Sequence, residues 1–300
     1  MDMTQNKCCR HGANLRRRRR RRRKILRSII FSCSIIAVAV FVAVGSRMIR
    51  SGDGRTNKYD VEAGNNTYDN AVIENSKISE KNKIQNNQSM LDDIMNSTQY
   101  PKQLKDLALK NEEALEFVYD YPAEHVKEHT IDLTEEASMD SVPLFVQWDK
   151  RWGYEKYSGN FFAASGCGPT TLSMVVVYLT HDREASPIAV AKYSKEAGYS
   201  VDGSGSSWTL ISEGCMHYGV KAKAVALDES RMKAELDEGH PIVVNVGPGD
   251  FTDTGHFMVI TGYDDEGFSI NDPNSIEKSG KRWLFKNISS QIRAVWSMYV

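Results

Sequence analysis

The sequence is poor in cysteine and lacks the familiar metal-binding patterns. Only 5 of its 300 residues are cysteine, and neither a His-Glu-x-x-His nor a Cys-x-x-Cys spacing occurs. The scarcity of cysteine excludes a disulfide-stapled scaffold. The missing ligand motifs predict chemistry without a metal or other cofactor.

Long apolar runs are scarce as well. The one candidate membrane span, Ile29 to Gly45, has seventeen uncharged residues and follows a basic run from Arg16 to Lys24. It is at the short end for a spanning helix, and the positive-inside rule keeps the basic run in the cytoplasm. We expect a cytoplasmic segment over 1–28, a signal-anchor over 29–45 in the plasma membrane, and the remainder outside the cell. Cleavage near Gly45, with secretion, is the alternative.

Charge is distributed unevenly despite a net charge of -1. Residues 1–50 hold 14 of the 38 Lys and Arg but a single one of the 39 acids, which leaves 24 basic and 38 acidic residues from position 51 onward. A nucleic-acid-binding role for the basic run would need a basic folded domain attached to it, and the chain from position 51 onward is acidic, so we expect no nucleic-acid partner. The sequence gives no indication of the oligomeric state.

Several segments precede the largest domain. Residues 46–98 are rich in Asn, Ser, Lys and Asp and predict a disordered stalk. Within a prefix at 99–122, apolar spacing predicts short helices over 101–110 and 112–119. Helices of this length are unstable alone, so they should dock as a structural brace or as an inhibitory prefix. The acidic stretch 123–141 is predicted to be a linker.

The segment around Cys167 has the features of a nucleophile site. Gly166-Cys167-Gly168-Pro169 leads into the apolar run Leu172 to Leu179, which predicts a buried helix. Pro169 suits a first helical turn, so Cys167 should lie at the helix N-terminus. Backbone N–H groups and the helix dipole favour a thiolate there. The alternative is a small buried hydrophobic residue in a glycine turn.

A matching base and orienting group lie downstream. Residues 255–263 predict a strand, 264–267 a turn and 268–271 a returning strand. Antiparallel pairing would bring Asp272, just after the second strand, close to His256 near the start of the first. Either residue alone is more often structural. Together, and after a cysteine at a helix start, they are candidates for a base and the group that orients it.

The rest of the C-terminal region has helices first and strands later. A helix is predicted from Ser186-Pro187 to about Ala197, and a buried strand over 241–246. The loop 247–252, just ahead of His256, should line a substrate groove, and Gly203 to Ser207 should form a turn at its edge. Two more strands are expected, near Arg282 and Val295. This order predicts an α+β domain.

Three motifs in this chain order carry a family resemblance. Gly166-Cys167-Gly168-Pro169-Thr170, Gly255-His256-Phe257 and Asn271-Asp272-Pro273 resemble the cysteine-peptidase family thirty-nine-like domain. Its members are relatives of the bacteriocin double-glycine-leader peptidases. The resemblance covers about 142–300 and implies a papain-like fold, with Cys on the helical part and His and Asp on an antiparallel sheet. It also implies Cys167 as nucleophile, His256 as general base and acid, and Asp272 as the residue that fixes the imidazole tautomer.

Gln147 is the candidate oxyanion-hole residue. Papain-like enzymes place a glutamine a few residues before the cysteine, whereas about twenty residues separate Gln147 from Cys167. A loop could still return Gln147 to the site, with the Cys167 backbone N–H as the second donor. The alternative is a glutamine without a catalytic part.

The sequence thus predicts a membrane-anchored extracellular cysteine peptidase. It would hydrolyse a peptide or amide bond of a peptide or protein substrate through a thioester acyl-enzyme. Three alternatives stay open. One is a cell-wall endopeptidase or amidase, although those usually have Asp-Cys-Ser. The others are an acyl or peptidyl transferase on the same fold and a non-catalytic surface-binding module.

Overall fold

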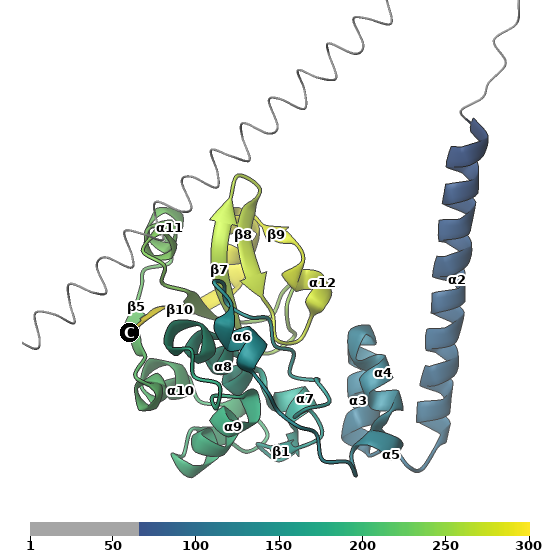
Figure 1. Ribbon diagram of the computed structural model, residues 1–300, viewed down its shortest axis with the longest axis horizontal. Coiled ribbons are helices and arrows are strands. Elements are labelled where there is room, and N and C mark those ends of the chain that lie inside the picture. Colours follow the sequence, from purple (N-terminus) through teal and green to yellow (C-terminus); the bar gives the residue numbers. More distant parts are fainter. Residues whose placement is uncertain (1–65) are drawn as a thin grey trace, which may run out of the picture. The chain divides into compact units, whose positions relative to one another are not determined.

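The computed structural model describes residues 66–300 (Figure 1). The chain divides into two units, residues 1–69 and 70–300, of which the first lies almost entirely outside the described residues. The predicted segments 1–28 and 29–45 also lie outside them. Among the helices within 66–300, none is both long and apolar enough to cross a membrane.

A six-stranded antiparallel sheet forms one half of the domain, in the order β5-β10-β6-β7-β8-β9. The strands at 241–246, 255–263 and 268–271 are confirmed, and so are the two later ones. The bounds are β5 Lys221–Ala224, β6 Ile242–Val246, β7 His256–Asp264, β8 Gly267–Asn271, β9 Arg282–Trp283 and β10 Ile292–Tyr299.

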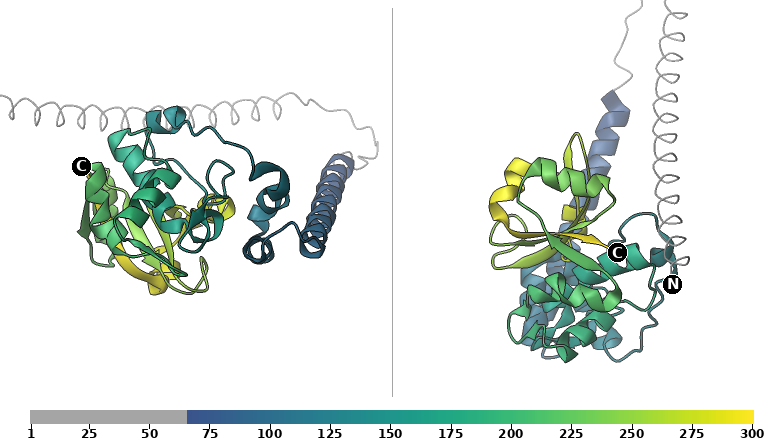
Figure 2. Two further views of the ribbon diagram at one scale, coloured as in Figure 1. Left: turned by 90° about the horizontal axis from the view of Figure 1, so that it is seen from below. Right: turned by 90° about the vertical axis from the view of Figure 1, so that its left-hand side faces the viewer.

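Both faces of this sheet are covered. Along β6, Val243 belongs to the core shared with α8 (Cys167–Thr180) and α9 (Pro187–Glu196), while Ile242 and Val244 belong to the core under α11 (Glu229–Asp237). Successive strand residues point to opposite faces, so every residue of β6 is buried. In Figure 2 the green-to-yellow sheet lies between α11 and the teal helical part. The α+β layout is therefore as predicted.

Helix α8 is the central helix of the domain. All residues from Gly168 to Val177 are buried, which is typical of a helix that is covered on every side. α9 confirms the helix predicted from Pro187 to about Ala197. After α9 the chain forms the short α10 (Thr209–Ser212) and then a 3-10 turn, in which Cys215 is fully buried in the core.

The prefix helices are present and docked. α3 (Lys102–Lys110) is followed by a 3-10 turn, η1 (Glu112–Ala114), and by α4 (Leu115–Tyr119). Their buried residues form a cluster with Phe161 and Ala163 of the C-terminal domain. Packing supplies the stability that such short helices lack alone.

Two of the predicted unstructured segments are wrong in part. Residues 66–96 form α2 (Asn66–Asn96) instead of a disordered stalk, since this stretch has neither Pro nor Gly and its end buries Ile94 against the prefix helices. Residues 46–65 lie outside the described part. The predicted linker 123–141 contains α6 (Thr134–Ser138), and it buries Leu133 and Ala137 in the main core. A few apolar residues in each segment, such as Ile94 and Leu133, are enough to pack it against the rest of the domain.

Short elements complete the fold. They are α5 Tyr121–Glu124, β1 Lys156–Tyr157, β2 Asn160–Phe161, α7 Phe162–Ser165, β3 Ser200–Val201, β4 Gly205–Ser206, η2 Gly214–Tyr218, α12 Ile276–Ser279, α13 Phe285–Ile288 and η3 Ser289–Gln291.

Candidate active site

Cys167 is the first residue of α8, as the sequence predicts. The two flanking glycines are needed because neighbouring groups lie too close for a side chain. A Cβ on Gly166 would lie 2.6 Å from the Phe162 ring, and one on Gly168 would lie 2.5 Å from Ser206 Oγ. Cys167 itself stays partly exposed. The helix start thus presents a thiol beside free backbone N–H groups.

A hydrogen bond fixes this helix against the strand that carries His256. Thr171, one turn into α8, donates its hydroxyl to the Phe257 carbonyl at 3.0 Å. Phe257 directly follows His256, the first residue of β7. From the neighbouring strand, Asn245 donates its side-chain amide to the His256 carbonyl at 3.2 Å. The start of α8 and the start of β7 are thereby held together.

His256 and Asp272 form a buried pair. Nε2 of His256 lies 2.7 Å from Oδ1 of Asp272, and the Asp272 side chain is almost completely inaccessible. The same oxygen accepts from the Asn274 backbone N–H at 2.8 Å. Among the described residues, Oδ2 of Asp272 has no hydrogen-bond partner. A carboxylate on Nε2 leaves Nδ1 as the imidazole nitrogen available to Cys167.

The electrostatics favour a charged pair between Cys167 and His256. Burial opposes the imidazolium, but the Asp272 carboxylate and the Cys167 thiolate outweigh it and raise the pKa of His256 to about 10. Burial also opposes the thiolate, yet the hydrogen bond and charge of His256 hold the pKa of Cys167 below its usual value. The expected resting state at neutral pH is therefore a thiolate beside an imidazolium.

Asparagines on either side of Asp272 have other partners. Asn271 donates to the carbonyls of Val142 and Pro143, at 3.1 and 3.0 Å. The side chain of Asn274 accepts from Asn111 at 3.1 Å. Both amides thus hold neighbouring segments in place, while Asp272 faces His256.

Gln147 reaches the site despite its distance in the sequence. Its backbone N–H donates to the Pro273 carbonyl at 2.7 Å, and its Nε2 donates to the Ala163 carbonyl at 2.7 Å. The side chain is only 4 % exposed, and no described residue pairs with its Oε1. Gln147 lines the same cleft as Cys167 and His256. The loop between Gln147 and Cys167 therefore returns the chain to the site.

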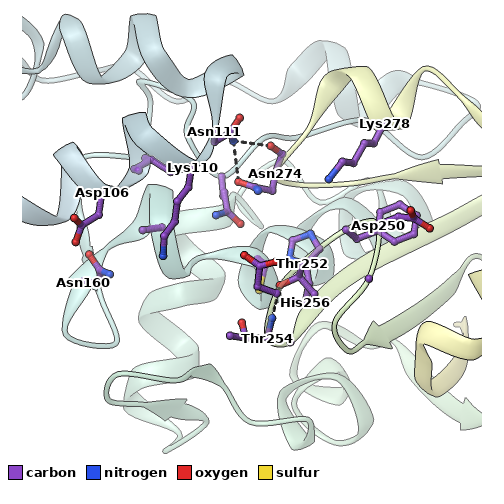
Figure 3. Close-up of a pocket in the computed structure, with 18 of the residues that line it drawn as sticks. Asp106, Lys110, Asn111, Asn160, Asp250, Thr252, Thr254, His256, Asn274 and Lys278 are labelled. Atoms are coloured by element: carbon purple, nitrogen blue, oxygen red, sulfur yellow. Dashed lines mark hydrogen bonds between the residues drawn. The ribbon is translucent and has the colours of Figure 1, made fainter. Parts of the chain in front are cut away.

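Two clefts meet at Cys167. The first, of about 510 Å³, is bounded by the loop before His256, as predicted, and by α3 (Figure 3). The second, of about 650 Å³, is bounded by the turn from Gly203 to Ser206, also as predicted, and by Arg293. Asn160, Ala164 and Thr254 line both. The nucleophile candidate thus lies along a continuous surface groove rather than in a closed pocket.

The sequence did not predict the wall supplied by the prefix. Asp106, Lys110 and Asn111, from α3 and the residue after it, line the first cleft, and Lys278 does so from α12 (Figure 3). The apolar spacing of α3 indicated that it docks, but no sequence signal indicated where. Among residues 66–300, no group of three or more His, Cys, Asp or Glu is placed to hold a metal ion.

Comparison with known proteins identifies the family of the chain. The model of the Peptidase_C39 like family matches residues 139–300. The chain belongs to this family. The family resemblance and its extent from about residue 142 are confirmed, and membership suggests a cysteine peptidase.

Solved structures with a similar chain include two peptidases. One is the peptidase domain of Streptococcus ComA, a bi-functional ABC transporter involved in a quorum sensing pathway; it is 19% identical, covers 53% of this chain and 96% of that chain, and has a TM-score of 0.39. The other is described as a putative C39-like peptidase from Bacillus anthracis, 18% identical over 53% of this chain and 95% of that chain, with a TM-score of 0.33. A comparison with curated proteins found no match.

Proposed function

We propose that this C39-like protein is a cysteine peptidase with Cys167 as nucleophile, His256 as base and acid, and Asp272 as the residue that orients His256. The observation that carries the proposal is the buried 2.7 Å contact between His256 and Asp272, next to a cysteine at a helix start. Family membership supports the same chemistry.

The reaction follows from these roles. The Cys167 thiolate attacks the carbonyl carbon of the scissile bond, and the carbonyl π electrons move to oxygen. The tetrahedral intermediate collapses as the His256 imidazolium gives its proton to the departing amine, which leaves a thioester. Neutral His256 then takes a proton from water, whose oxygen displaces the Cys167 sulfur and yields a free carboxylic acid.

The oxyanion would be stabilised by two N–H donors. One is the backbone N–H of Cys167 at the start of α8. The other is Gln147 Nε2, which uses one N–H for the Ala163 carbonyl and retains a second. A pair of preorganised donors is the usual requirement for acyl transfer.

An extended peptide is the substrate class that suits the groove. Clefts on both sides of Cys167 allow chain segments on both sides of the scissile bond. Their linings mix charged, amide, hydroxyl and glycine residues, which suits backbone hydrogen bonding.

We also propose that residues 29–45 anchor the chain in the plasma membrane, with the peptidase domain outside the cell. The supporting observation is the basic run 16–24 directly before the apolar stretch. Protease added to intact cells should remove the domain and leave an N-terminal fragment in the membrane fraction. Retention of the domain in the cytosol would contradict the proposal, and release of the whole domain into the medium would indicate signal cleavage.

The peptidase assignment is tested by trapping the acyl-enzyme. The full-length chain is incubated with a mixed peptide library or with muropeptides and quenched in acid, and Cys167-containing peptides are examined by mass spectrometry for a thioester adduct. Wild type should accumulate adducts and release free acids, while Cys167→Ala forms none and His256→Ala forms them far more slowly. Products bearing an added amine would indicate a transferase. The absence of adducts with peptides and muropeptides would leave the binding module as the better interpretation.

A further inference from the structure

The turn that carries Asp272 receives unusual support from the prefix. Within the turn, Ser279 Oγ accepts from the Asp272 backbone N–H at 2.9 Å and donates to the Ser275 carbonyl at 2.7 Å. These local bonds join Asp272 to α12. Further bonds come from Asn111 and Glu113, which are more than 150 residues earlier in the chain.

Asn111 holds the residue that binds Asp272. Its Nδ2 donates to both oxygens of Asn274, the carbonyl at 2.9 Å and the side chain at 3.1 Å (Figure 3). The Asn274 backbone N–H in turn donates to the Asp272 carboxylate. The Oδ1 of Asn111 accepts from the Glu113 N–H at 3.0 Å, so Asn111 also caps the turn η1. One side chain therefore fixes η1 and the Asp272 turn relative to each other.

Glu113 holds the other end of the same turn. Its carboxylate accepts from the Ser275 hydroxyl, from the Ile276 N–H at 2.7 Å and from the Glu277 N–H at 3.1 Å. Ile276 and Glu277 begin α12, whose N–H groups have no partner within the helix. A single carboxylate with three charge-assisted bonds is a rigid clamp.

We propose that Asn111 and Glu113 are positioning residues for the active site: they set the place of Asp272 and, through it, the charge state of His256. The proposal rests on the proposed roles of Cys167, His256 and Asp272. The prefix is then required for the chemistry of the site. A propeptide that can be removed, or a helix that only stabilises the fold, would not be required in this way. The partial exposure of Cys167 with the prefix docked supports this view.

The proposal has a specific chemical consequence. The raised pKa of His256 depends on the Asp272 carboxylate, and the lowered pKa of Cys167 depends on charged His256. A misplaced carboxylate would weaken both effects. The reactive thiolate should therefore be lost at mildly acidic pH even when the domain stays folded.

The test uses the full-length chain with Glu113→Gln, Asn111→Ala and, as the matched control, Glu116→Gln. Glu116 lies on the next turn of the prefix and is exposed, so the control makes the same charge change outside the clamp. Iodoacetamide labelling of Cys167 at pH 5.5 to 8.5 is followed by peptide mapping. The titration of His256 is followed by NMR, and circular dichroism confirms folding.

At pH 6 we expect Glu113→Gln and Asn111→Ala to slow Cys167 labelling by about ten- to a hundredfold, as for a misplaced catalytic group. The pKa of His256 should fall in both variants. Glu116→Gln should have the labelling rate and the His256 pKa of wild type, and Glu113→Asp should recover part of both. Folded clamp variants with the wild-type labelling profile and His256 titration would overturn the proposal. If wild-type Cys167 itself reacts like an ordinary thiol, the proposed peptidase site fails instead. In that case the His256 pKa still tests the clamp: a lower pKa in Glu113→Gln than in Glu116→Gln supports it, and equal values contradict it.

Discussion

Asp272 faces Nε2 of His256 at 2.7 Å, and the imidazole therefore has Nδ1 on the side of Cys167. The carboxylate is fully buried, so its charge acts on the imidazole without screening by water. This relationship links a residue after β8 to the first residue of β7, and through it to the first residue of α8.

Cys167 should be alkylated faster than an ordinary thiol at acidic pH. Its pKa is lowered by charged His256, whose own pKa is raised by the Asp272 carboxylate, so the thiolate persists as pH falls below 7. Cys215 is an internal comparison, because burial raises its pKa to about 11. Mapping of iodoacetamide adducts from pH 5 to 9 measures both. Equal labelling of Cys167 and Cys215 at pH 6, or unchanged labelling of Cys167 in His256→Ala, would contradict the charged pair.

Asp272→Asn should lower reactivity far more than stability. The variant keeps the shape of the side chain but removes the charge that raises the pKa of His256. The comparable change in a serine-protease triad costs about 10⁴ in turnover; since a thiolate needs less help from the base, we expect about 10² for peptide hydrolysis. Turnover and thermal unfolding are measured for the variant and for Asp265→Asn in the exposed β7–β8 turn. Full activity in Asp272→Asn would remove Asp272 from the mechanism.

Gln147→Ala should separate nucleophile activation from oxyanion stabilisation. The loss of one oxyanion donor typically costs about 10² to 10³ in turnover. Alkylation by iodoacetamide develops no oxyanion, so labelling of Cys167 should stay within about twofold of wild type. Gln103→Ala, at a glutamine that lines the same cleft from α3, serves as control. If Gln147→Ala slows labelling as much as hydrolysis, Gln147 supports the fold of the site rather than the transition state.

Two adjacent threonines in α8 should respond in opposite ways to valine. Thr171 donates to the Phe257 carbonyl, so Thr171→Val should lower the free energy of unfolding by about 1 kcal/mol. The hydroxyl of Thr170 is buried and, among the described residues, lacks a partner. Thr170→Val should therefore be neutral or slightly stabilising. Urea unfolding of both variants gives the comparison, and equal losses would show that the α8 to β7 hydrogen bond is not the cause.

Local sequence patterns determined the positions of Cys167, His256 and Asp272. Gly-Cys-Gly-Pro before an apolar run defines a helix start through local backbone preferences, and α8 begins at Cys167. His256 and Asp272 are only 16 residues apart and belong to one hairpin, so alternation and a turn suffice to predict that they meet. The order of the three motifs also sufficed to identify the family.

Only the tertiary structure decided what surrounds that centre. Local composition made residues 66–96 and 123–141 look unstructured, because the free energy that orders Ile94 and Leu133 comes from surfaces elsewhere in the chain. Likewise, the return of Gln147 and the contact of Glu113 with α12 depend on how preformed elements dock. Adjacent residues determine short-range backbone and side-chain preferences. Docking depends on the shape of buried surfaces, which exist only after the chain has folded.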